Sequence, residues 1–258
     1  MTLEPGLSGS PGLSGSPGLS GSPGLSGSPG LSGGIIAAGA GSRLRQAGWA
    51  VPKPMVEVAG VPLIESAIRN FVAAGITRLS IIVNEQERDC AAWVRGRFPG
   101  LDLRLIVKTT ASSLESFREI VGGPDAGRML VSTVDAWCRA EDFRRFVDAA
   151  LRRPREATVL AVTPLVADEK PLGVIADAQG RITAFGVESP TLVTAGVYLV
   201  SERARRLEPP PRLGRLREHL AWLLESGEPM YGEVIETVVD VDRAEDVALA
   251  EALAARIS

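Results

Sequence analysis

The stretch from Gly33 to Ile64 reads GGIIAAGAGSRLRQAGWAVPKPMVEVAGVPLI and is the part of the chain that decides its fold. Its apolar run, Ile35–Ala38, predicts a buried strand, and the glycine-rich segment Gly39–Arg43 ends that strand in a turn. Glycines directly after a strand let the backbone approach a ligand closely, and successive N–H groups in such a turn form a concavity suited to phosphate oxygens. The stretch therefore predicts a strand followed by an anion-binding loop.

Three cations lie close to this loop in the sequence. Arg43 and Arg45 follow its glycines, and Lys53 stands between two prolines that restrict the backbone around it. A glycine loop with three cations nearby indicates a polyphosphate site. The alternative is a dinucleotide-binding Rossmann loop, but that loop needs a third glycine where Leu44 stands and makes no use of Lys53.

Three segments of the same stretch resemble the signature of the nucleotidyltransferases that activate sugar, polyol or choline phosphates. These segments are Ala37–Leu44, Pro52–Met55 and Val58–Ile64, and they occur in the family's order and spacing. The resemblance implies that Arg43 and Lys53 are catalytic. It also implies a set of nucleotide-binding residues, namely Ala37, Ala38, Gly39, Ala40, Gly41, Ser42 and, in a later segment similar to one in small cytidylyltransferases, Lys108.

The composition is that of a soluble globular protein. Of 258 residues, 45% are hydrophobic and 23% are charged, which is enough to build a core. A net charge of −3 gives no argument for nucleic acid or an anionic membrane surface as a partner. The apolar runs are too short to span a membrane and two cysteines are too few for a disulfide framework, so we expect a cytoplasmic location.

Residues 5–34 consist of a Pro-Gly-Leu-Ser-Gly-Ser repeat whose last copy ends in Gly33-Gly34. Such a segment has too little apolar area to offset the entropy of ordering it, so we predict disorder. The expected organisation is a disordered repeat segment at residues 1–32 and one nucleotidyltransferase domain at residues 33–258. The repeat is interpreted as a spacer, with a docking tail as the alternative.

Strand and helix patterns alternate through the rest of the chain, which predicts an α/β fold, a Rossmann-like three-layer sandwich with a mostly parallel sheet. A hairpin at residues 173–182 predicts a small antiparallel excursion. The other predicted strands cover residues 79–83, 101–107, 129–134, 157–162 and 235–241, and the helices cover residues 62–74, 85–98, 141–152, 216–225 and 244–257.

Two acidic positions are candidate metal ligands. Asp135 follows the predicted strand 129–134, and ligands of parallel sheets bind beyond the carboxyl ends of strands. Val239–Asp246 resembles the family's acidic ending, and the resemblance implies that Asp135 and Asp242 bind Mg²⁺. Alternation places Asp240 and Asp242 on the same side of the strand, so the choice between them stays open. Both Asp135 and Asp242 have helix capping as an alternative role.

Two further segments have structural explanations beside functional ones. The hydroxyls that follow Lys108 suit a cap for a helix near Leu114 as well as contacts to a nucleotide or acceptor. The chain's one histidine, His219, lies on the predicted helix 216–225, where packing or surface exposure is more common than catalysis.

The resemblance, closest in size to the compact cytidylyl- and uridylyltransferases, implies transfer of a nucleotidyl group from a nucleoside triphosphate to a small phosphorylated acceptor, with Mg²⁺ as cofactor. A molybdenum-cofactor nucleotidyltransferase and a catalytically inactive nucleotide-binding module are the alternatives. Thr194–Tyr198 departs from the family's usual pattern at the acceptor site. The sequence therefore leaves the acceptor, the base and the oligomeric state open.

Overall fold

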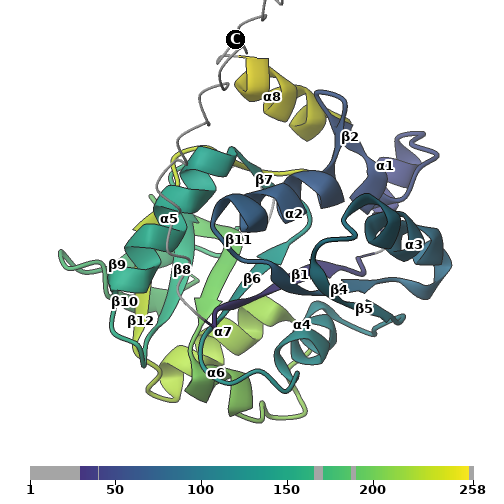
Figure 1. The fold of residues 1–258 in the computed structure, drawn as a ribbon. Coiled ribbons are helices and arrows are strands. Elements are labelled where there is room, and N and C mark those ends of the chain that lie inside the picture. Colours follow the sequence, from purple (N-terminus) through teal and green to yellow (C-terminus); the bar gives the residue numbers. More distant parts are fainter. Residues whose placement is uncertain (1–29, 40, 166–170, 187–189, 256–258) are drawn as a thin grey trace, which may run out of the picture.

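A seven-stranded sheet forms the middle of the molecule, with strands in the order β12-β8-β11-β6-β1-β4-β5 (Figure 1). The computed structural model describes residues 30–39, 41–165, 171–186 and 190–255. The strands of this sheet are β1 (Ser32–Ala37), β4 (Arg78–Val83), β5 (Asp102–Val107), β6 (Met129–Thr133), β8 (Thr158–Thr163), β11 (Val193–Val200) and β12 (Met230–Val234). Only β11 in this sheet is antiparallel to its neighbours, which confirms the mostly parallel sheet.

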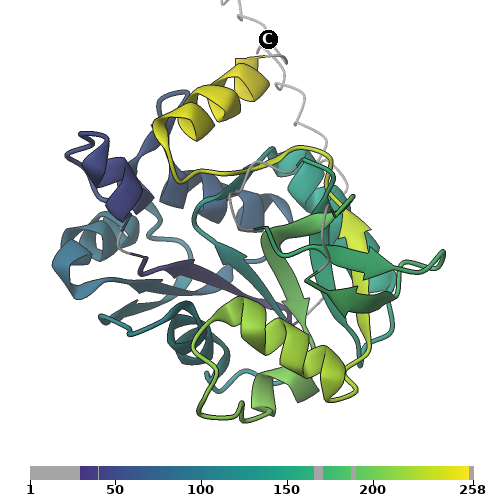
Figure 2. The ribbon, with the colours of Figure 1, turned by 180° about the vertical axis from the view of Figure 1, so that it is seen from behind.

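Helices cover both faces of the sheet, as the opposite views of Figures 1 and 2 show. One hydrophobic cluster joins the sheet to α2 (Leu63–Ala73), α3 (Arg88–Arg97) and α5 (Ala140–Arg152). A second cluster joins its other face to α4 (Ser113–Val121), α6 (Glu202–Arg206) and α7 (Leu216–Glu225). The three-layer sandwich predicted from the sequence is therefore confirmed.

Two glycines of β1 let helices approach the sheet from both sides. A Cβ atom on Gly33 would lie 2.6 Å from the ring of Phe71 on α2, and one on Gly34 would collide with the side chain of Ile120 on α4. Distances below about 3 Å are too short for carbon atoms in van der Waals contact. The last copy of the repeat thus ends inside β1, an interior strand of the sheet.

Three small antiparallel pairs lie outside the main sheet. They are β2 (Glu57–Val58) with β3 (Val61–Pro62), β7 (Ala136–Cys138) with β13 (Val238–Asp240), and β9 (Val174–Ala176) with β10 (Ile182–Phe185). The last pair is the predicted hairpin. The remaining elements are α1 (Ser42–Gln46), α8 (Ala244–Ala255) and the 3₁₀ turns η1 (Lys53–Met55) and η2 (Glu85–Glu87).

The prediction of one strand over residues 235–241 is wrong. This part of the chain contains two strands instead of one. β12 pairs with β8 in the main sheet, and β13 pairs with β7 in a separate two-stranded sheet. The Ile235 N–H still donates to the carbonyl of Val162, but the Thr237 hydroxyl then donates to Asp142 on α5 over 2.8 Å. This contact turns the chain away from the main sheet and toward β7.

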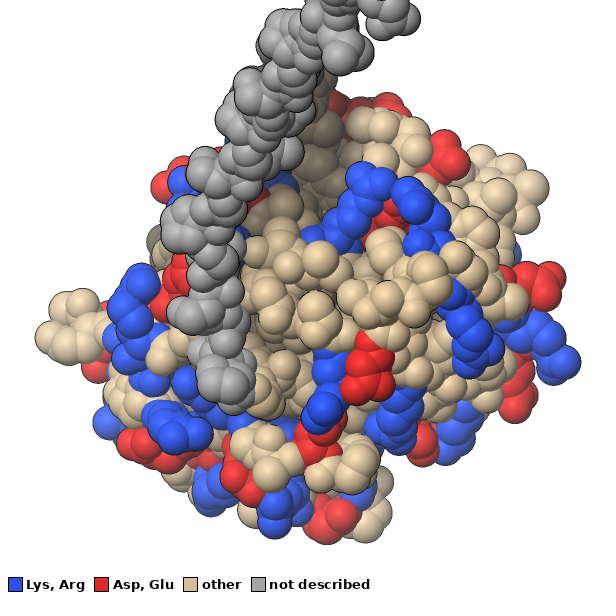
Figure 3. Space-filling model, viewed as in Figure 1, with Lys and Arg blue, Asp and Glu red and all other residues tan. Residues whose placement is uncertain are grey.

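No helix of the described residues is both long enough and apolar enough to cross a lipid bilayer. On the face drawn in Figure 3, basic and acidic side chains are interspersed over the surface. Apart from its final residues, the repeat lies outside the described part of the chain.

Candidate active site

The glycine loop leaves the carboxyl end of β1 and turns directly into α1. Gly41 precedes α1 with φ of 56°, a left-handed conformation that glycine adopts without a steric cost. A Cβ atom at Gly41 would lie 2.8 Å from the Cβ of Lys53. The predicted loop and the predicted lysine are therefore packed against each other, and a side chain at Gly41 would separate them.

The other residues predicted in this loop follow β1 in sequence. Ala37 and Ala38 are buried, whereas Gly39 and Ser42 are exposed. Ala40 lies outside the described residues. The loop thus presents its backbone at the edge of the sheet where the parallel strands end, which is the edge at which such sheets bind ligands.

Lys53 is buried, with only 7% of its side chain exposed. It begins η1, where Pro54 follows it and the Met55 N–H donates to the carbonyl of Pro52 over 2.8 Å. The two prolines and this bond restrict the backbone and direct the lysine side chain toward the carboxyl ends of β6 and β13.

The pairing of β7 with β13 brings the distant acidic residues together. Asp135 lies between β6 and β7, and Asp240 ends β13 opposite Ala136. The carbonyl of Asp135 also accepts from the Val241 N–H at 3.0 Å. Asp246 accepts from the backbone N–H of Asp242 at 2.9 Å, which fixes that residue at the start of α8. Oxygen atoms of Asp135, Asp240 and Asp242 lie within 4.8 Å of one another.

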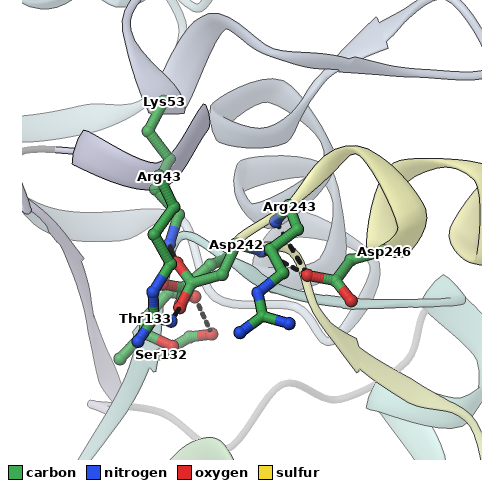
Figure 4. Close-up of polar contacts among 8 residues, drawn as sticks. Arg43, Lys53, Ser132, Thr133, Asp242, Arg243 and Asp246 are labelled. Carbon is green, nitrogen blue, oxygen red and sulfur yellow. Dashed lines mark hydrogen bonds and ion pairs between the residues drawn. The ribbon is translucent and has the colours of Figure 1, made fainter. Parts of the chain in front are cut away.

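Both predicted catalytic cations contact this acidic cluster (Figure 4). The Lys53 ammonium lies 2.6 Å from Asp135 and also pairs with Asp242, and Arg43 donates to Asp242 over 2.8 Å. Burial opposes the charge on Lys53, but Asp135 and then Asp242 outweigh burial and raise its pKa above the usual value. Burial likewise opposes the charge on Asp135, but Lys53 outweighs it and lowers the pKa of this carboxyl. Lysine and aspartate are therefore both charged at neutral pH.

The chemistry of the cluster fits a hard divalent cation. Carboxylate oxygens are the ligands that Mg²⁺ and Ca²⁺ prefer, and three carboxylates from two chain segments converge here. The sequence left the choice between Asp240 and Asp242 open, and the structure brings both residues to the cluster. Asp242 pairs with both Lys53 and Arg43.

Lys108 is engaged elsewhere. Its ammonium lies 3.0 Å from Glu115 and 2.7 Å from Glu119, both on α4. The cap expected near Leu114 is present, because the Ser112 hydroxyl accepts from the Glu115 N–H at 3.2 Å. Of the site residues predicted from the sequence, Arg43, Lys53, Asp135 and Asp242 thus meet in one place, and Lys108 does not contact them.

The family of the chain follows from a comparison with known proteins. A family model described as nucleotidyl transferase matches residues 33–205, well over half of the chain. The chain belongs to this family. The matched region begins at the second residue of β1 and contains the glycine loop, Lys53 and Asp135.

Curated proteins similar to this nucleotidyl transferase chain are longer than the region they share with it. A bifunctional IPC transferase and DIPP synthase of Rubrobacter xylanophilus is 30% identical over 233 residues, which cover 84% of this chain and 50% of that protein. A 2-aminoethylphosphonate cytidylyltransferase of Lancefieldella rimae is 37% identical over 70 residues, 27% of this chain and 28% of that protein. The chain therefore spans about half or less of the length of these relatives.

A solved structure supports the fold of the nucleotidyl transferase chain. The inositol-1-phosphate CTP transferase from T. maritima superposes with a TM-score of 0.74 at 18% sequence identity, covering 89% of this chain and 98% of that one. The superposition covers almost all of that chain, so the two folds are alike.

A cavity of about 210 Å³ opens beside the acidic cluster of this nucleotidyl transferase and contains residues that sequence reasoning missed. Asp135 and Asp240 line one part of it, and Tyr198 and Arg217 line another. At Gly196, φ is 72° and a Cβ atom would lie 2.7 Å from the Thr133 hydroxyl, so this glycine lets β11 pass close to the end of β6. Beside the two aspartates, the lining residues with a sequence signal lie in the Thr194–Tyr198 segment.

Proposed function

We propose that this nucleotidyl transferase moves a nucleotidyl group from a nucleoside triphosphate to a small phosphorylated acceptor, a sugar, polyol or choline phosphate, and releases pyrophosphate. The observation that carries the proposal is the meeting of Lys53 and Arg43 with Asp135 and Asp242 beside the glycine loop. The names of two similar proteins contain inositol 1-phosphate and 2-aminoethylphosphonate, and these compounds support an acceptor of this class.

In the proposed reaction, an acceptor oxygen forms a bond to the α-phosphorus while the bond from that phosphorus to the bridging oxygen breaks. The electron pair leaves with pyrophosphate. Both reactants are anions, so the protein's contribution is to neutralise charge and align the reacting atoms. Backbone N–H groups of the glycine loop bind the triphosphate, and Lys53 and Arg43 neutralise it. A phosphate monoester is already largely ionised near neutral pH, so the reaction needs no general base.

We further propose that Asp135 and Asp242, with Asp240 beside them, hold Mg²⁺. When bound, the ion would supply Lewis-acid charge against the phosphate oxygens. Lys53 and Arg43 form ion pairs with Asp135 and Asp242 in this structure. The same two cations are therefore available to the triphosphate once their carboxylate partners bind a metal.

The test is an assay of pyrophosphate release with each of the four ribonucleoside triphosphates, Mg²⁺ and a panel of phosphorylated acceptors. We expect turnover with at least one pair, and loss of about 10²–10³ in kcat in Asp135→Asn and in Lys53→Ala. Arg78→Ala is the charge-matched control, because Arg78 is exposed and pairs with Asp102 at the amino end of the sheet. Circular dichroism checks that the variants fold.

Two outcomes contradict the proposal. Nucleotide binding without turnover for every acceptor would favour the inactive binding module. Full activity in folded Asp135→Asn and Lys53→Ala would mean that the acidic cluster and its lysine are not the catalytic site.

A further inference from the structure

Asp242 is held in place differently from the other two carboxylates of the acidic cluster. Asp135 lies between β6 and β7, and Asp240 ends β13, so the pairing of β7 with β13 places both residues. Asp242 lies in the connection between β13 and α8, outside both elements, and 31% of its side chain is exposed. The position of this carboxylate therefore depends on what fixes the connection.

Asp246 fixes that connection from within α8 (Figure 4). Its carboxylate accepts from the backbone N–H of Asp242 at 2.9 Å and from that of Arg243 at 2.8 Å. Asp246 is the third residue of the helix, and a side chain at this position reaches back to N–H groups that the helix itself leaves unpaired. The two bonds restrict the backbone of Asp242 and thereby the direction of its side chain.

The helix that carries this carboxylate is anchored to the core. Val247 and Ala250 are buried in the hydrophobic cluster on one face of the sheet. Arg139, directly before α5, donates to the carbonyl of Leu253 near the end of α8 over 2.9 Å. Figure 1 shows α8 beside β2, and the hairpin of β2 and β3 follows η1, which begins with Lys53. α8 thus packs against both the core and the hairpin that follows this lysine.

We propose that Asp246 is a positioning residue of the acidic cluster, which holds Asp242 so that this carboxylate meets Asp135 and Asp240 and binds the metal with them. This inference rests on the proposed function, through the proposed Mg²⁺ site. Among the described residues, Asp246 lies outside the set of carboxylates that converge there, so it acts through the backbone of Asp242 and not as a ligand. Partners that orient metal ligands contribute about 10- to 100-fold to metal affinity.

Capping of α8 is the structural alternative. Acidic residues in the first turn stabilise a helix through its dipole, and α8 has two of them, Glu245 and Asp246. Glu245 is exposed and carries the same charge in the same turn, whereas the bonds to Asp242 and Arg243 come from Asp246. Substitution of each residue therefore separates a general effect of charge from the effect of the two bonds.

Titration of the full chain with Mn²⁺, followed by electron paramagnetic resonance without substrates, measures the cluster directly, because Mn²⁺ prefers the same oxygen ligands as Mg²⁺. We expect Asp246→Ala to weaken Mn²⁺ binding about tenfold or more. Asp246→Asn retains a carbonyl oxygen that accepts from N–H groups, although less strongly than a carboxylate, and should weaken binding less than about threefold. Glu245→Gln, the matched control, should leave the affinity unchanged.

The Mg²⁺ dependence of nucleotidyl transfer gives a second measurement. In Asp246→Ala, the Mg²⁺ concentration for half-maximal rate should rise about tenfold, whereas kcat at saturating Mg²⁺ should change less than about threefold, because the ligands remain. Since Asp246 acts through Asp242, adding Asp246→Ala to Asp242→Ala should cause no further loss of Mn²⁺ affinity. Thermal unfolding followed by circular dichroism checks that each variant folds.

The outcomes separate this inference from the proposed function. Equal Mn²⁺ affinity in the parent chain and in Asp246→Ala would overturn the inference, even with a lower Tm, because Asp246 would then only cap α8. A loss in Asp246→Asn or Glu245→Gln as large as that in Asp246→Ala would also overturn it, since charge would explain the effect. Absence of Mn²⁺ binding by the parent chain would overturn both the inference and the proposed Mg²⁺ site. The expected pattern of Mn²⁺ binding without turnover of any acceptor would support the inference and refute the proposed function.

Discussion

His219 lies buried between two aromatic rings, where its titration opposes folding. Its ring centroid is 5.6 Å from that of Phe117 and 5.5 Å from that of Trp222. Burial, and to a smaller extent Arg118, lowers the pKa of His219 to about 4 from its ordinary value of 6.5. As the pH falls below 6.5, the unfolded chain binds a proton that the folded chain binds only near pH 4. Stability is therefore present above pH 6.5 and is lost as the pH falls toward 4.

This titration predicts that His219 contributes a loss of about 2 kcal/mol in the free energy of unfolding between pH 7.5 and pH 5.0. His219→Phe retains the ring packing and removes the titrating group. Urea unfolding of both proteins at the two pH values measures the difference. Between pH 7.5 and pH 5.0, the free energy of unfolding of the variant should fall by about 2 kcal/mol less than that of the parent chain. An equal fall in the two proteins would contradict the prediction.

At the scale of single residues, sequence reasoning succeeded where a motif or a strand end marked the position. Lys53 stands out because two prolines flank it, and Asp135 stands out because a buried strand precedes it. Arg217 is one of many arginines, and nothing in its local sequence shows that its helix will start beside a cavity. That information lies in the contact between α7 and Ser113, more than a hundred residues earlier.

At the scale of elements, the apolar periodicity predicted most helices and strands but missed changes of sheet. The segment from Met230 to Asp240 contains two strands whose partners, β8 and β7, lie in different sheets, and no local pattern specifies that exchange. Gly33 and Gly34 end the last copy of the repeat and were left outside the predicted strand, although they pair with both neighbours of β1. Their strand conformation follows from the close approach of α2 and α4, which is tertiary information.

Asn84 joins the carboxyl ends of three strands, and its position gives it a predicted effect on nucleotide binding. Its side-chain oxygen accepts from the Gln86 N–H at 3.0 Å and from the Thr109 hydroxyl at 3.2 Å, and its amide donates to the Ala38 carbonyl at 3.5 Å. Asn84 thereby ties the glycine loop after β1 to the loops after β4 and β5. No sequence motif marked it.

Because Asn84 positions loops and does not reach the acidic cluster, Asn84→Ala should raise KM for the nucleoside triphosphate about three- to tenfold with little change in kcat. Thr109→Val removes one of the same contacts and should raise KM less. Since the two residues share a hydrogen bond, the double variant should be less impaired than the product of the single effects. Steady-state kinetics at saturating acceptor measure this, and an unchanged KM in Asn84→Ala would exclude the positioning role.

At the scale of the whole molecule, the boundary between repeat and domain is set by the central sheet. The sequence placed the boundary at residue 33, and we propose that the repeat is dispensable for folding only up to residue 29. Leu31 packs against the hydrophobic core, and Ser32 is a buried residue of β1 that pairs with Met129. Ser32, Gly33 and Gly34 form half of β1, which lies between β6 and β4.

Two truncations that differ by five residues should therefore behave differently. Deletion of residues 2–29 leaves β1 and Leu31 in place, so we expect Tm to change by less than about 2 °C and nucleotidyl transfer to persist. Deletion of residues 2–34 removes the pairing of Gly33 with Leu79 and Leu130, in the middle of the sheet, and should leave the chain unfolded. Differential scanning calorimetry with circular dichroism measures both. A large drop in Tm in the shorter deletion would show that the repeat contributes to folding, because the paired residues of β1 are intact in that variant.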